Sequence, residues 1–199
     1  MKRDIEFLFE LGTLRYIDRT WKQFLSPGVA NNAEHVFRVA WIAFTLAKYE
    51  KGKVNQEKIL KMALLHDITE SRTGDVNYLS RQYTKRNEEK AIHDMVEDTV
   101  HEKELLALAK EYEERKTLES RIVKDADNLD VELEIRELIE KEPRIWKTIS
   151  NSRNKKVLPI LYTETAKKFW KNINKSNPHD WHLLASGNRF NGGDWKKKK

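Results

Sequence analysis

The sequence predicts a single all-α domain, a bundle of helices without a β-sheet. Three observations favour it. Apolar residues recur every three to four positions in long segments, and no segment alternates between apolar and polar residues as a half-buried strand does. The composition is 35% charged and 39% hydrophobic, with 7 Gly and 4 Pro in 199 residues, which is typical of helical proteins. We expect one domain over residues 1–175, followed by an irregular basic tail at 176–199.

Three helices are predicted in the N-terminal part, over residues 3–17, 32–51 and 55–65. A loop with Ser26-Pro27-Gly28 separates the first two. Asn31 followed by Glu34 matches a capping box, so the second helix begins near residue 32. This helix is apolar on nearly every side, and we therefore expect it to be central. The third helix ends at the pair His66-Asp67.

Further amphipathic helices are predicted over residues 88–100, 105–114, 117–139 and 159–170. Pro143 ends the long helix that starts at residue 117. The segment from Asn174 onward has no helical periodicity and is predicted to be irregular. No internal repeat or linker divides the chain.

Composition excludes several classes of protein. The chain has no cysteine, which excludes disulfides and cysteine-ligated metal sites. It shows neither a signal peptide nor a run of about 20 apolar residues, so we expect a cytoplasmic protein without a membrane partner. Of the net charge of +6, residues 175–199 carry +4. A charge confined to a tail is usually solvated, and we expect no nucleic-acid partner.

Ionisable residues gather after the apolar run Met62 to Leu65, where His66, Asp67 and Glu70 follow one another and Asp75 comes after a glycine. Burying these groups beside a core is costly unless their charge is neutralised. A divalent cation can do this, because imidazole and carboxylate both ligate metals. His35, in the first turn of the second helix, and Asp127, within the helix 117–139, complete a set of ligands on separate helices.

The segments Ala33-Glu34-His35, Leu65 to Glu70 with Thr73-Gly74-Asp75, and Val123 to Asp127 resemble the HD-domain superfamily of metal-dependent phosphohydrolases. Within it they are similar to the 5′-deoxynucleotidase family, over about residues 4–142. The resemblance implies an HD-type helical bundle, often a homodimer, that removes phosphate from deoxynucleoside 5′-monophosphates with one divalent ion, Mn²⁺, Co²⁺ or Mg²⁺. The family's last ligand closes a Lys-x-x-Asp element. This matches Asp127 and leaves Asp125 as an acid on the helix surface or beside a ligand.

The resemblance also implies roles for individual residues. Glu70 lies one helical turn after Asp67 and would orient a water molecule or accept its proton, so both are assigned to catalysis. The metal ligands would be His35, His66, Asp67 and Asp127. The substrate contacts would be Arg19, Trp21, Asp75, Lys124 and Glu113. Simpler readings stay open at this point: an exposed carboxylate for Glu70, a turn residue for Asp75, and a loop arginine with a core tryptophan for Arg19 and Trp21.

Other activities make different demands. A phosphodiesterase with two metals needs more histidines, but His93 lies opposite the apolar face of its helix and His101 lies in a charged junction, so both are predicted to be at the surface. A triphosphohydrolase needs more cations, for which the candidates are Lys22, Arg38, Arg72 and Arg81. A non-catalytic nucleotide-binding regulator would have no physical need for the four ligands and Glu70.

Overall fold

A computed structural model describes residues 1–25, 28–141 and 143–184. In these ranges the chain is helical, and its only extended pairing is an isolated antiparallel bridge between Asp18 and Asn31. None of the described helices has the length and hydropathy that a membrane crossing requires. The α-helices are α1 Lys2–Leu11, α2 Asn32–Tyr49, α3 Gln56–Leu65, α4 Glu70–Thr73, α5 Glu88–Val96, α6 Glu102–Glu114, α7 Leu118–Ile139, α8 Pro143–Lys156, α9 Glu164–Ile173 and α10 Asp180–Leu183. Short 3₁₀ turns occupy Gly12–Tyr16, Thr20–Gln23, Ser80–Gln82 and Leu158–Ile160.

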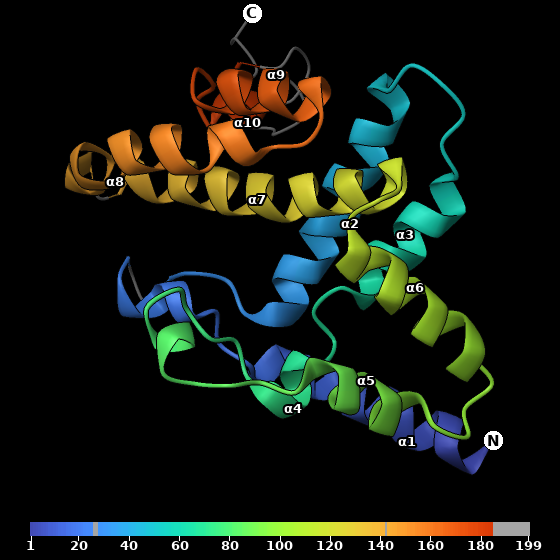
Figure 1. Cartoon of the computed structure of the whole chain (residues 1–199). Coiled ribbons are helices and arrows are strands. Elements are labelled where there is room, and N and C mark those ends of the chain that lie inside the picture. Colours follow the sequence, from blue (N-terminus) through green and yellow to red (C-terminus); the bar gives the residue numbers. More distant parts are fainter. Residues whose placement is uncertain (26–27, 142, 185–199) are drawn as a thin grey trace, which may run out of the picture.

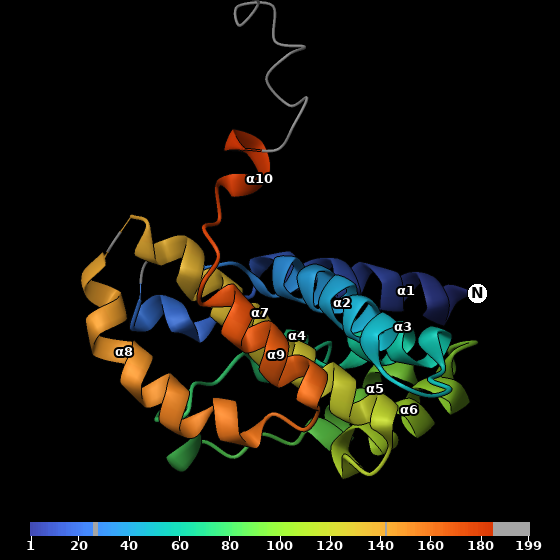
Figure 2. The same ribbon diagram turned by 90° about the horizontal axis from the view of Figure 1, so that it is seen from above.

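Helix α2 is the centre of the bundle and packs against both α3 and α7 (Figure 1). Helices α1, α4 and α5 lie together on one side of this crossing, while α8 and α9 cover α7 on the other (Figures 1 and 2). The side chains that meet at the centre are fully buried, and burial of each large one stabilises the fold by about 1.5–3 kcal/mol. They include Val39, Leu46, Ile59, Met62, Ile122 and Leu129. The all-α prediction is confirmed.

The start of α2 is fixed by the predicted capping box. The Asn31 side chain accepts a hydrogen bond from the backbone N–H of Glu34 at 3.0 Å, and the Glu34 carboxylate accepts one from the backbone N–H of Asn31 at 3.0 Å. Such a reciprocal pair satisfies two donors that a helix N-terminus leaves open. The first turn of α2, which carries Asn32 and His35, is therefore held in place.

Several predicted boundaries are wrong. Helix α1 ends at Leu11 rather than at residue 17, because the chain tightens there into a 3₁₀ turn. Helix α5 ends at Val96, and Asp98 follows with a left-handed backbone, φ 60°, which does not continue a helix. Pro143 does not simply end a helix, because it is the first residue of α8, a position where proline is well tolerated. Helix α8 is absent from the sequence prediction because its residues are mostly polar.

The C-terminal part differs in the same way. Helix α9 begins at Glu164, after Thr163 as N-cap, rather than near residue 159. The predicted irregular segment from Asn174 contains the short helix α10, at the edge of the bundle in Figure 2. The rest of the predicted tail, with its four terminal lysines, lies outside the described residues.

Asp125 has a different role from the expected one. It is completely buried on α7, and its carboxylate accepts hydrogen bonds from the backbone N–H of Tyr162 at 2.7 Å and of Thr163 at 2.8 Å. The Thr163 hydroxyl donates a third, at 2.8 Å. Asp125 therefore fixes the start of α9 against α7. It lies neither on the surface nor beside a predicted metal ligand.

We expect Asp125→Ala to lower the free energy of unfolding by about 2–4 kcal/mol, because it removes the acceptor of a partly buried and a fully buried backbone N–H group. Urea denaturation followed by circular dichroism measures this. The matched control is Glu164→Ala at the same helix start. There the exposed carboxylate pairs with Lys167, and its loss should leave the stability nearly unchanged. Equal stabilities of the two variants would contradict the assignment.

Candidate metal centre and active site

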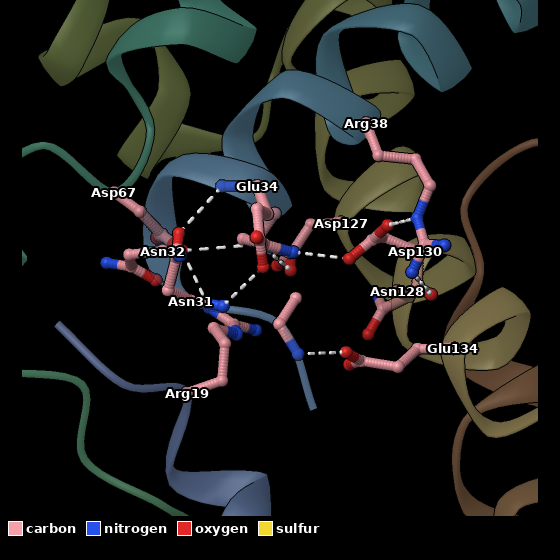
Figure 3. Close-up of polar contacts among 12 residues, drawn as sticks. Arg19, Asn31, Asn32, Glu34, Arg38, Asp67, Asp127, Asn128, Asp130 and Glu134 are labelled. Carbon is pink, nitrogen blue, oxygen red and sulfur yellow. Dashed lines mark hydrogen bonds and ion pairs between the residues drawn. The ribbon is translucent and has the colours of Figure 1, made fainter. Parts of the chain in front are cut away.

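Three predicted ligands from three helices converge at the centre of the bundle. The ligand atoms of His35 (α2), His66 (at the end of α3) and Asp127 (α7) all lie within 4.8 Å of one another. Asp67 joins them, because its Oδ2 is 3.4 Å from His35 Nε2 and 3.3 Å from His66 Nε2. Figure 3 shows Asp67 and Asp127 near the first turn of α2.

The two imidazoles are oriented by contacts at their other nitrogen. His66 Nδ1 donates to the backbone carbonyl oxygen of Ala63 at 2.7 Å, and His35 Nδ1 lies 2.5 Å from Asp130 Oδ2. Both Nε2 atoms consequently face the centre, 3.3 Å apart. A carboxylate or carbonyl behind each ligating histidine is the usual arrangement at protein metal sites. Two nitrogens and two carboxylates are donors that Mn²⁺, Co²⁺ or Mg²⁺ can use, so the residues fit a divalent cation.

The electrostatics of the cluster favour positive charge. Burial lowers the pKa of His35, but hydrogen bonds to Asp127, Asp130 and Asp67 together raise it well above its ordinary value. Burial raises the pKa of Asp127, but Lys124 and His35 hold it well below its usual range. Lys124 Nζ is 2.6 Å from Asp127 Oδ2. A group of carboxylates that stabilises nearby cations in this way is what a metal site needs.

Asp130, which the sequence analysis missed, supports His35 from behind. Its second oxygen accepts a hydrogen bond from Arg38 Nε (Figure 3). Arg38 also pairs with Glu137 at 2.8 Å. Arg38 was a candidate for gripping a triphosphate, but its guanidinium is engaged on the side of His35 away from the cluster. The sequence did offer one sign of this role, because Asp130 follows the predicted ligand Asp127 by almost one turn of α7 and so lies on the same side of the helix.

The predicted phosphate grip Arg19 is buried beside the cluster. Its Nη1 donates to Asp67 Oδ2 at 3.1 Å and to the Asn32 side chain at 3.3 Å. Asp75 holds the turn that carries Arg19, because it accepts hydrogen bonds from the backbone N–H of Thr20 at 2.8 Å and from the Thr20 hydroxyl at 3.1 Å. Asp75 thus contacts this turn rather than a ligand histidine. Arg19 is not an ordinary loop arginine in this structure.

Glu70, the first residue of α4, is 4% exposed, which excludes the reading of a surface carboxylate. Burial and the charges of Asp67 and Asp75 raise its pKa to about 8, against the opposing effects of Arg19 and Asn32. Its two oxygens accept hydrogen bonds from Asn32 Nδ2 at 2.6 Å and from Arg86 Nη1 at 3.1 Å. Neither donor was identified from the sequence, since isolated Asn and Arg residues in no motif carry no signal.

Trp21 and Glu113 lie farther out. Trp21 is partly exposed and packs against Phe24 and Tyr78, with ring centroids 6.3 Å away in both cases. Glu113 is exposed and lies 3.8 Å from Arg115. It lines a cleft of about 640 Å³ that also reaches His66. Within the described residues, neither side chain has a hydrogen bond or ion pair to the four predicted ligands.

The residues that a two-metal phosphodiesterase or a triphosphohydrolase would need lie at the surface or have other partners. His93 and His101 are exposed, as predicted. Of the remaining candidates for a triphosphate grip, Lys22 pairs with Asp18 at 2.5 Å. Arg72 pairs with Glu10, and Arg81 donates to a backbone carbonyl. These three side chains are therefore engaged by groups outside the His/Asp cluster and do not add positive charge to it.

Comparison with known proteins agrees with this geometry. The family model of the HD domain matches residues 11–170. The chain is 31% identical over 187 residues to 5′-deoxynucleotidase HDDC2 of Dictyostelium discoideum, with 88% of this chain and 95% of that protein covered. It is 28% identical over 149 residues to 5′-deoxynucleotidase HDDC2 of Danio rerio, with 71% and 72% covered.

Solved structures show the same fold. One, described as a predicted metal-dependent phosphohydrolase from Magnetospirillum magnetotacticum, has a TM-score of 0.70 and 27% identity, with 87% of this chain and 93% of that chain covered. Another, a conserved hypothetical protein from Pyrococcus furiosus, has a TM-score of 0.68 and 26% identity, with 86% and 99% covered. The chain therefore belongs to the HD domain family and is a metal-dependent phosphohydrolase.

Proposed function

We propose that the chain hydrolyses deoxynucleoside 5′-monophosphates to a deoxynucleoside and inorganic phosphate. The observation that carries this proposal is the position of Arg19, a buried guanidinium 3.1 Å from Asp67 at the edge of the His/Asp cluster. A guanidinium fits the oxygens of a phosphate monoester as a two-pronged donor. The relatives named 5′-deoxynucleotidase support the same substrate class.

We assign one divalent cation to His35, His66, Asp67 and Asp127, with Mn²⁺, Co²⁺ or Mg²⁺ as candidates. When bound, such a cation lowers the pKa of water and offsets negative charge on the phosphate. The fit rests on the donor set and on the two Nε2 atoms that face the same centre.

The chain's own residues divide the remaining work. Glu70, with its raised pKa, accepts a proton as the water oxygen forms its bond to phosphorus. That proton is then available for the 5′-oxygen, whose bond to phosphorus breaks. Arg19 and Lys124 offset the charge of the phosphate oxygens. Asp75 holds the Arg19 turn, so we assign it a supporting part in substrate binding.

Two assignments concern the nucleoside. Trp21, in the turn after Arg19, is placed against the sugar edge, where a flat ring excludes a 2′-hydroxyl. Glu113 lines the cleft that reaches His66 and is assigned to the outer part of the substrate site. Both assignments follow from the family resemblance. They are supported by the position of Trp21 next to the Arg19 turn and of Glu113 in the cleft that reaches His66.

A homodimer in the cytoplasm completes the proposal. The aromatic side chains of Phe37, Trp41 and Tyr49 on α2 are mostly exposed. Two grooves of about 580 and 770 Å³ are both lined by Trp41. A second copy of the chain would cover this surface, and light scattering in solution tests it.

The first prediction concerns substrate and metal. With Mn²⁺ or Co²⁺ we expect phosphate release from dAMP, much less from AMP, and no tripolyphosphate from dATP. EDTA should abolish activity and Mn²⁺ should restore it, because the proposal assigns activation of the attacking water to the bound cation. Malachite-green phosphate detection and chromatography of the products measure this. Tripolyphosphate from dATP would favour the triphosphohydrolase alternative, and inactivity on all three would favour a regulator.

The second prediction concerns the base. Glu70→Gln removes the proton acceptor but keeps the shape, so kcat for dAMP should fall about 100-fold or more while KM changes little. Glu57→Gln, a substitution of an exposed glutamate paired with Lys61, is the control and should behave like the wild type. Full activity of Glu70→Gln would overturn the assigned role.

The third prediction concerns sugar selectivity. Trp21→Ala opens space beside the sugar, so the ratio of kcat/KM for dAMP over AMP should fall about tenfold. Phe24→Ala, in the same aromatic cluster but farther along the turn, serves as the control for loosening of the cluster. If both variants change the ratio equally, Trp21 has no specific contact with the sugar.

A further inference from the structure

Glu70 is held from two directions by donors that are not metal ligands. Asn32, in the first turn of α2, donates to one carboxylate oxygen at 2.6 Å. Arg86, just before α5, donates to the other at 3.1 Å. Asn32 is 0% exposed and the Arg86 side chain is 12% exposed. A carboxylate offers about four acceptor positions, so two are occupied by the protein and two remain for water.

We propose that Asn32 and Arg86 are positioning residues that fix the orientation of the Glu70 carboxylate for proton transfer. The inference rests on the proposed role of Glu70 as base and extends it to two residues outside the ligand set. Each occupies a different oxygen, so the carboxylate cannot rotate without losing both hydrogen bonds. An orientation fixed before the reaction lowers the cost of reaching the reactive geometry.

Asn32 also connects the base to the phosphate grip. Its Nδ2 donates to Glu70, while its Oδ1 accepts a hydrogen bond from Arg19 Nη1 at 3.3 Å. One amide therefore sets the relative positions of the proton acceptor and of the guanidinium that we assign to the phosphate. The capping box at Asn31 holds the turn that carries this amide.

Arg86 is itself held by two further contacts. Its Nη1 also donates to the backbone carbonyl of Gly74 at 3.1 Å, and its Nη2 pairs with Glu88 at 2.5 Å. The guanidinium thus joins both ends of α4 to the start of α5.

The same three residue types recur elsewhere in the bundle, around a glutamate on α7 to which we assign no part in the chemistry. Glu132 on α7 is 1% exposed and accepts hydrogen bonds from Arg153 Nε at 2.7 Å and from Asn174 Nδ2 at 2.9 Å. This second Asn–Glu–Arg group ties α7 to α8 and to the end of α9. It provides matched controls, because equivalent substitutions remove equivalent hydrogen bonds to a buried glutamate.

The test compares Asn32→Leu and Arg86→Met with Asn174→Leu and Arg153→Met in the full chain. Arg86 touches neither Arg19 nor the predicted ligands, so Arg86→Met should lower kcat for dAMP about 10- to 100-fold with KM nearly unchanged. Asn32→Leu should lower kcat similarly and also raise KM, because Arg19 loses an acceptor. Arg86→Lys should recover part of the activity. The two control variants should lower the melting temperature without a comparable change in kcat.

Two further measurements separate positioning from structural damage. Binding of Mn²⁺ alone, followed by electron paramagnetic resonance, should change less than about threefold in Arg86→Met. Adding Arg86→Met to Glu70→Gln should cause no further loss of kcat, since the two residues act as one unit. An equal loss in the wild-type and Glu70→Gln backgrounds, or an equal loss from Arg153→Met, would overturn the inference.

The proposed function can fail separately from this inference. If the wild type releases no phosphate from dAMP, the substrate assignment fails. If Glu70→Gln is fully active, the role of the base fails. If the wild type releases phosphate from dAMP and Glu70→Gln loses activity, but Arg86→Met keeps its kcat, only the positioning by Asn32 and Arg86 is refuted.

Discussion

The structure depends on one electrostatic constraint, the gathering of two imidazoles and several carboxylates where α2, α3 and α7 cross. His35, His66, Asp67 and Asp127 lie within a few ångströms of one another inside the bundle. Such a group is stable only if cations or protons compensate the carboxylates. Lys124 and Arg19 contribute to this compensation from the protein side. A divalent cation held in the same place would supply charge and catalytic chemistry together.

Around this centre the fold supplies rigid supports. Asp130 orients His35 from behind, and the Ala63 carbonyl orients His66. Asp75 fixes the turn with Arg19, while Asn32 and Arg86 hold Glu70. Most of these supports come from elements other than the one that carries the residue they orient. The position of each functional group is therefore set mainly by hydrogen bonds between separate segments of the fold, some of them helices and some of them loops.

A buried carboxylate has a different meaning in different parts of this bundle. Asp125 and Glu132 are as buried as Glu70, but their oxygens are used to join α7 to α8 and α9. Glu70 is joined to its neighbours in the same way, and it lies beside Asp67, which is a predicted metal ligand. Burial and hydrogen bonding alone thus do not distinguish the proposed catalytic acid Glu70 from the structural acids Asp125 and Glu132.

The sequence by itself determined the helical class and the capped start of α2, because periodicity and capping are local patterns. It also predicts the ligand set His35, His66, Asp67 and Asp127, because the motifs that carry these residues are ordered along the chain. It did not contain the boundaries of α5 and α9 or the existence of α8, whose polar residues show no apolar period. Only the tertiary structure decided which side chains face Glu70. It also decided that Asp125 accepts hydrogen bonds from the backbone just before α9, and that Asp130 lies behind His35. These contacts join residues up to 95 positions apart, and a lone Asn, Arg or Asp has no local pattern that reveals such a partner.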